Sequence, residues 1–203
     1  PLRTAGKTFA EYEARVRELG RKLMLSLSSQ SPDLVLFMPF LFEQMNDTRN
    51  SNEHRKYELL PAFIDGLFEA APRGVTIVNC LQLSYRWNNA VMIETARTIH
   101  LKENLAHTSV PAAYRRALRS GLSVWLDYEN STHAWNYLNV DNNYFSPPTI
   151  RRLVPLFLRE SDEYVIIYSQ NVRWWSKRNI PAAYSEVFRT IRETSLNSLR
   201  RRR

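Results

Sequence analysis

Four short apolar runs, separated by longer stretches with helical spacing, constrain the fold of this chain more than any other feature. The runs cover residues 34–38, 75–78, 122–126 and 164–168. A short apolar run without polar alternation is typical of a strand that is covered on both faces. Because the runs lie roughly 40 residues apart with helices between them, they predict a parallel α/β fold with crossover connections.

The stretches between the apolar runs predict the helices. Thr8 and Glu11 have the spacing of a capping box at the start of the first one. Its apolar residues, spaced as one helical face, are Phe9, Tyr12, Val16, Leu19, Leu23 and Leu27. The expected helices cover residues 9–27, 59–68, 89–105, a short segment from 111, 147–158 and 181–196.

The number of strand-helix units suggests part of a larger architecture. A complete (β/α)8 TIM barrel takes about 250 residues, so four units are expected to form half of one, its C-terminal half. The alternative is a small open parallel sheet with helices on both faces. We expect one domain over residues 1–199 and a basic tail at 200–203. Half a barrel would leave two sheet edges open, which predicts self-association or a missing N-terminal partner.

Composition excludes several kinds of site. No GxGxxG and no GxxxxGK[ST] occurs, so a nucleotide-binding loop has no support and no cofactor is expected. Cys80 is the single cysteine, and the four histidines lack metal-ligand spacing, so neither a disulfide nor a metal site is expected. No apolar run reaches the roughly 20 residues that span a bilayer, and no membrane partner is predicted. The net charge is +8, but four arginines form the terminal run 200–203 and the other basic residues are mostly spread along helices beside acids, which argues against nucleic acid as the partner.

Parallel α/β proteins carry their sites beyond the C-terminal ends of the strands, and polar and aromatic residues gather there. Among these polar residues are Asp47 and His54, which lie in the stretch after the first strand. The candidates are Glu43 after the first strand, Asn79, Gln82 and Tyr85 after the second, Trp125 inside the third with Asp127, Tyr128 and Glu129 after it, and Gln170, Trp174 and Trp175 after the fourth. Because it lies inside a strand, Trp125 could equally be a core residue.

Aromatic rings beside amides and carboxylates suit a sugar, because rings stack on pyranose C–H faces while planar polar groups bind the hydroxyls. The alternative is that the rings cap the core or contact the missing half of the barrel. Hydrolysis of a glycosidic bond needs two carboxyl groups, and the candidates are Asp127 as acid or base with Glu129 or Glu43 as its partner. Residues 127 and 129 would point the same way if the third strand continued through them.

Several segments in order along the chain resemble bacterial glycoside-hydrolase-like TIM-barrel proteins. They are residues 9–27, 60–66, 76–79, 124–127, 161–170 and the pair Trp174 and Trp175. The resemblance implies a barrel fold and carbohydrate as the ligand. In the pattern of that family the second strand ends in Asp, with Glu a few residues later, and the fourth ends in Tyr-Ser-Glu.

This chain departs from that pattern, because Asn79, Gln82 and Gln170 stand at the three acidic positions. Amides keep hydrogen bonding to a sugar but cannot transfer the catalytic proton. The departure supports a second hypothesis, a catalytically inactive carbohydrate-binding or structural relative. A third hypothesis is a basic nucleic-acid-binding module, which would use Arg86, Arg173, Lys177 and Arg178 on the same loops.

Overall fold

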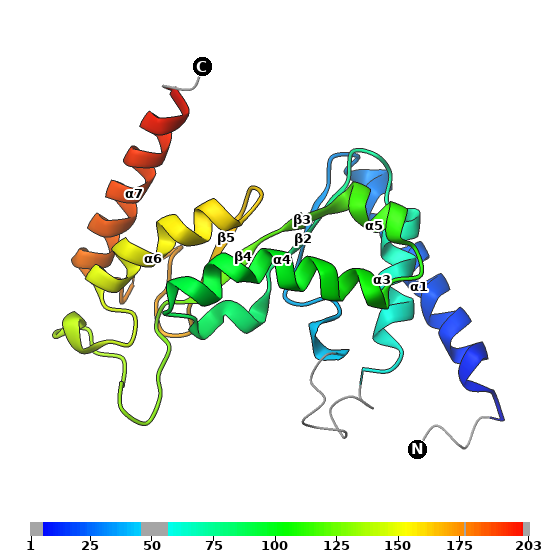
Figure 1. Cartoon of the computed structure of the whole chain (residues 1–203), viewed down its shortest axis with the longest axis horizontal. Helices are drawn as coiled ribbons and strands as arrows, with labels where there is room; N and C mark the ends of the chain where they lie inside the picture. Colours follow the sequence, from blue (N-terminus) through cyan, green and yellow to red (C-terminus); the bar gives the residue numbers. More distant parts are fainter. Residues whose placement is uncertain (1–5, 46–56, 177, 201–203) are drawn as a thin grey trace. The chain divides into compact units, whose positions relative to one another are not determined.

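The computed structural model describes residues 6–45, 57–176 and 178–200 (Figure 1). It confirms the parallel α/β class: the strand pairs of its two sheets are parallel, and helices lie between consecutive strands except the third and fourth, residues 118–120 and 122–125, which follow each other directly. The sheets are open and are not closed into a barrel. Half of a larger barrel and a single domain over 1–199 stay predictions. Asp47, His54, Lys177 and the end of the basic tail lie outside the described residues.

The chain divides into two compact units, of which the first, unit 1, comprises Pro1–Leu81 and Arg97–Ser120. Its three strands form a sheet in the order β1-β2-β3. Its elements are α1 (Phe9–Gln30), β1 (Val35–Met38), η2 (Glu43–Met45), α3 (Leu60–Ala70), β2 (Thr76–Asn79), the C-terminal part of α4 (Ala90–His107), α5 (Pro111–Ala117) and β3 (Leu118–Ser120). The first two strands lie where the apolar runs predict them.

Helices α1 and α3 pack unusually closely in unit 1 (Figure 1). A Cβ atom on Gly20 would overlap the carbonyl oxygen of Phe63, and one on Gly66 would overlap that of Arg17. The two backbones can approach this closely only because both positions lack a side chain.

The buried face of α1 therefore differs from the apolar face that its spacing suggests. Gly20, Met24 and Ser28 are buried, whereas Leu19 and Leu23 are 54% and 44% exposed. Small residues form part of the buried face because they permit the close crossing with α3. The capping box of Thr8 and Glu11 is formed as expected.

Unit 2 comprises Gln82–Ala96 and Gly121–Arg203. Its two strands pair in parallel with the register Leu122 to Val165 and Trp125 to Tyr168. Its elements are η3 (Gln82–Arg86), the N-terminal part of α4, β4 (Leu122–Trp125), η4 (Val140–Asn142), α6 (Pro147–Glu160), β5 (Val165–Tyr168) and α7 (Ala182–Arg200). None of the helices in the described ranges is long and apolar enough to cross a membrane.

The third predicted strand is preceded by a further one. Residues 118–120 form β3 and pair with β2, and after Gly121 the chain continues as β4, which pairs with β5. The sequence Leu118-Arg119-Ser120 carries no apolar run, so its strand character comes from pairing with β2 and not from a local pattern.

Candidate functional site

The predicted residues at the strand ends fall into two groups, one in each unit. In unit 1 the structure brings Glu43 and Asn79 together, while in unit 2 it brings together Tyr85, Trp125, Asp127, Tyr128 and Gln170. Each group contains one buried carboxylate. The chemistry of the site depends first on what those carboxylates contact.

Glu43 is 3% exposed and has hydrogen-bond donors at both oxygens. Its Oε1 accepts hydrogen bonds from the side-chain amides of Asn79 and, at 2.9 Å, Asn104. Its Oε2 accepts the backbone N–H of Leu41 at 2.6 Å. The carboxylate thus ties η2 to the end of β2 and to α4, a set of contacts that satisfies a buried charge.

Asp127 is still more enclosed, at 1% exposure. Three consecutive backbone N–H groups, those of Gln170, Asn171 and Val172, donate to its carboxylate. The indole N–H of Trp125 adds a further bond at 2.9 Å. Successive amides that converge on one anion form a nest, here filled by the protein's own side chain. Asp127 therefore holds the loop after β5 against the end of β4.

Glu129 lies on the surface and accepts the backbone N–H of Trp135 at 3.1 Å. Strand β4 ends at Trp125, and the chain then turns, with the N–H of Tyr128 bonded to the carbonyl of Trp125. The strand therefore does not continue through residue 129, and residues 127 and 129 are not paired by strand geometry.

Segment η3 is fixed to β4 by a serine pair. Ser84 Oγ donates to the carbonyl of Ser123 at 2.7 Å and accepts the Ser123 N–H at 2.8 Å. The hydroxyl thus bonds both backbone groups of one residue of β4, as a neighbouring strand would. The contact places Tyr85 beside the ends of β4 and β5.

Five half-buried rings meet at these strand ends, and we call them the ring cluster: Tyr85, Trp125, Tyr128, Tyr144 and Tyr168. Tyr85 and Tyr168 stack with centroids 5.1 Å apart and planes 9° apart. Trp125 meets both of them edge to face, and Tyr128 meets Trp125 and Tyr144 in the same way. Offset stacks and edge contacts of this kind are favourable arrangements for aromatic pairs.

Exposed polar groups border the ring cluster. Gln170 Nε2 donates to the hydroxyl of Tyr168 at 3.3 Å, and the Arg86 guanidinium lies 5.9 Å from the centre of the Tyr128 ring. The Tyr144 hydroxyl donates to the Arg86 carbonyl at 2.9 Å. Burial raises the pKa of Tyr144, and the neighbouring Tyr128 adds to the rise while Arg86 opposes it. Gln82 is exposed at the start of η3.

The two tryptophans after β5 are placed differently from each other. The Trp174 ring packs edge to face on Phe188 of α7, with centroids 5.8 Å apart. Trp175 is 102% exposed. Among the residues that the structure describes, neither ring contacts the ring cluster, so the structure separates these two candidates from Tyr85, Trp125 and Tyr128.

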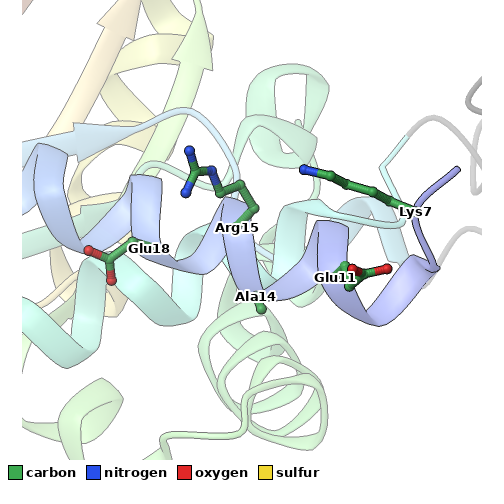
Figure 2. Close-up of a pocket in the computed structure, with 5 residues that line it drawn as sticks. All are labelled: Lys7, Glu11, Ala14, Arg15 and Glu18. Carbon is green, nitrogen blue, oxygen red and sulfur yellow. The ribbon is translucent and has the colours of Figure 1, made fainter. Parts of the chain in front are cut away.

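An open hollow lies along α1 and carries none of the predicted residues (Figure 2). Its lining consists of Lys7, Glu11, Ala14, Arg15 and Glu18. Glu11 already closes the capping box, which lowers its pKa, so the hollow is a charged helix surface and not a catalytic cleft.

No three His, Cys, Asp or Glu side chains within the described ranges gather as metal ligands do. Comparison of the chain with protein-family models, with curated proteins and with solved structures finds no match in any of the three. The resemblance to glycoside-hydrolase-like proteins therefore stays a prediction.

Three members of the site escaped the sequence reading. Tyr168 lies inside an apolar run and reads as a strand residue, although the register sets it opposite Trp125. Tyr144 lies in a segment without regular spacing, and the sequence suggests Arg86 only as a nucleic-acid contact. Knowledge of strand register could have identified Tyr168, since parallel strands place their last residues side by side.

Proposed function

We propose that this chain is a carbohydrate-binding relative of the glycoside-hydrolase-like barrel proteins, which binds sugar at the ring cluster of unit 2 without hydrolysing it. The observation that carries the proposal is the contrast between the two kinds of candidate. The two buried candidate carboxylates, Glu43 and Asp127, are occupied by internal hydrogen bonds, whereas the rings and their amide neighbours are half-buried or exposed.

The chemistry of hydrolysis argues for the absence of turnover. A general acid must reach the glycosidic oxygen within hydrogen-bond distance. Asp127 is 1% exposed and accepts bonds from four residues, and freeing it would release the loop after β5. Glu43 belongs to unit 1 and is likewise enclosed. Glu129 is exposed and accepts the backbone N–H of Trp135, and strand geometry does not pair it with Asp127.

The ring cluster has the composition that sugar binding requires. Its rings are fixed by contacts with one another, so they would lose little conformational freedom when a pyranose stacks on them. Gln170 and Arg86 border the rings, Gln82 stands exposed at the start of η3 three residues before Tyr85, and all three side chains can donate to sugar hydroxyls. Tyr168 and Tyr144 contribute phenolic hydroxyls at the same place.

Titration calorimetry of the full chain against a panel of soluble neutral oligosaccharides tests this proposal. We expect at least one oligosaccharide to bind, and Tyr128→Ala to weaken that binding by about tenfold through loss of a stacking ring. Gln170→Ala, which changes an exposed side chain, is expected to weaken it by several-fold. Tyr137→Ala is the matched control, because that tyrosine is exposed in another loop and contacts Trp135.

Three results would contradict the proposal. The first is wild-type protein that binds no oligosaccharide of the panel. The second is binding that Tyr128→Ala, Gln82→Ala and Gln170→Ala all leave unchanged. The third is release of reducing sugar by the wild type that stops in a folded Asp127→Asn variant, which would show Asp127 to be catalytic.

A further inference from the structure

Two loops of unit 2 each expose one large apolar side chain completely. Leu138 is 99% exposed, and Trp175 is 102% exposed. A scattered apolar residue on a surface is ordinary and needs no explanation. These two differ because each is displayed by a framework of hydrogen bonds and ring contacts that fixes the loop around it.

The loop of Leu138 is built on asparagines. Asn136 Oδ1 accepts the backbone N–H groups of Leu138 at 2.9 Å and Asn139 at 2.8 Å. The buried Asn143 accepts the N–H of Asn136 at 2.8 Å and donates to the Tyr184 hydroxyl at 3.0 Å. The backbone of Leu138 is thus tied inward through two asparagines to α7, while its side chain points into solvent.

The loop of Trp175 is tied down on both sides of the tryptophan. Asp127 holds its start through the N–H of Val172 at 3.1 Å. The N–H of Arg173 then bonds to the carbonyl of Arg178 at 3.0 Å, closing a short turn around the tip. Trp174 packs on Phe188, so of the two adjacent indoles one anchors the loop and the other is presented.

Both frameworks rest on the same stretch of α7. Trp135 stacks on Tyr184 with centroids 5.4 Å apart, and Trp174 packs on Phe188, one helical turn further along. The two loops are therefore anchored on adjacent turns of one helix within unit 2.

The charged side chains of these two loops are all basic and lie in the loop of Trp175. Residues 170–181 contain Arg173, Lys177 and Arg178 and no acid, and residues 134–140 contain no Asp, Glu, Lys or Arg. Arg173 and Arg178 are exposed, and neither guanidinium forms an ion pair with the residues that the structure describes. An apolar tip beside unpaired arginines is complementary to an anionic apolar interface.

We propose that the loops of Leu138 and Trp175 dock unit 2 on an anionic lipid surface. Leu138 and Trp175 enter the interface between headgroups and acyl chains, where an indole is favoured, and Arg173 and Arg178 contact the headgroups. Such attachment needs no helix that spans the bilayer. A lipid surface fits better than single-stranded nucleic acid, because bases stack on rings and gain little from an aliphatic leucine.

Vesicle flotation with the full chain tests this proposal, using phosphatidylcholine vesicles with and without phosphatidylserine. We expect binding only when phosphatidylserine is present, weakening as ionic strength rises. Leu138→Ser and Trp175→Ser should each weaken binding by about tenfold. Arg173→Glu and Arg178→Glu should each weaken it by at least about fivefold.

Controls separate these loops from general stickiness and charge. Val91→Ser removes an exposed apolar side chain on α4, and this variant should bind vesicles like the wild type. Arg152→Glu reverses an exposed charge on α6, and it should weaken vesicle binding less than Arg173→Glu or Arg178→Glu does. The proposal is overturned if wild type does not float with phosphatidylserine vesicles at low salt. It is also overturned if Trp175→Ser binds them unchanged, or if the wild type binds oligothymidylate but no vesicle.

Discussion

The carboxylate of Asp127, just beyond β4, accepts the backbone N–H of Val172 from the loop after β5 at 3.1 Å. With the N–H groups of Gln170 and Asn171, this contact makes one side chain the anchor of a whole loop. The candidate acid that the sequence favours most is enclosed because of these bonds. Asp127 is therefore expected to stabilise the loop after β5.

Replacement Asp127→Asn tests the anchoring role. An amide presents N–H hydrogens to some of the backbone donors, and we expect a loss of about 2–3 kcal/mol in the free energy of unfolding. Urea denaturation measures it. Glu129→Gln is the control two residues away, and its exposed side chain should change stability by no more than about 0.5 kcal/mol. An Asp127→Asn protein as stable as the wild type would show that the anchor is dispensable.

Glu43→Gln tests the corresponding anchor of unit 1. The Gln side chain keeps one acceptor oxygen, but its NH2 group replaces the other oxygen and faces an N–H donor. That donor is either an Asn side-chain amide or the backbone N–H of Leu41, each of which donates to Glu43 in the wild type. We expect destabilisation by about 1–3 kcal/mol, read from the urea midpoint, with faster amide exchange at the end of β2. Unchanged exchange there would contradict the role assigned to Glu43.

Gly66→Ala tests the close crossing of α1 and α3. The added methyl group meets the backbone of Arg17, which cannot move aside as a side-chain tip could, so we expect a loss of about 1–3 kcal/mol. Calorimetric melting temperatures measure the effect. Ser26→Ala on the exposed side of α1 serves as the control, and alanine there should leave the helix as stable or slightly more so. Equal melting temperatures for both variants would refute the tight crossing.

Cys80 is expected to make the free energy of unfolding fall as the pH rises in the alkaline range. Burial raises the pKa of its thiol to about 11 from an ordinary value of 9.0. The unfolded chain therefore loses this proton first as the pH rises, so the stabilisation is complete below pH 9.0 and declines toward pH 11. Urea midpoints at pH 8 and pH 10 should fall further for the wild type than for Cys80→Ala. Equal falls would contradict burial as the cause.

Sequence reasoning located most of the elements in this chain because the relevant patterns are local. Apolar runs and capping residues lie next to one another, and α1, α3, α4, α6 and α7 begin within one or two residues of the positions that those patterns predict. Strand β3 escaped because its sequence carries no such pattern and its pairing with β2 is a long-range event. The same limit applies to the buried face of α1, which depends on two glycines that lie on different helices.

The role of the candidate acids could not be predicted for a similar reason. The backbone donors that enclose Asp127 lie 43 to 45 positions further along the chain, and the sequence around Asp127 does not predict them. The rings were more accessible to prediction. The sequence groups Tyr85, Trp125, Tyr128, Trp174 and Trp175 as candidate sugar platforms, and the first three do meet. Trp174 packs on α7 instead, Trp175 is exposed, and joining Tyr168 to the cluster requires the strand register.

Saturation-transfer difference NMR on the full chain with the oligosaccharide panel tests the central claim most directly. Saturation of the protein should pass to sugar ring protons of a bound oligosaccharide, and Tyr128→Ala should reduce the transfer while Tyr137→Ala keeps it. The anomeric signals of the same sample should stay unchanged over a day. Transfer that is absent for every oligosaccharide, or new reducing-end signals that grow with time, would contradict a protein that binds carbohydrate at the ring cluster without hydrolysing it.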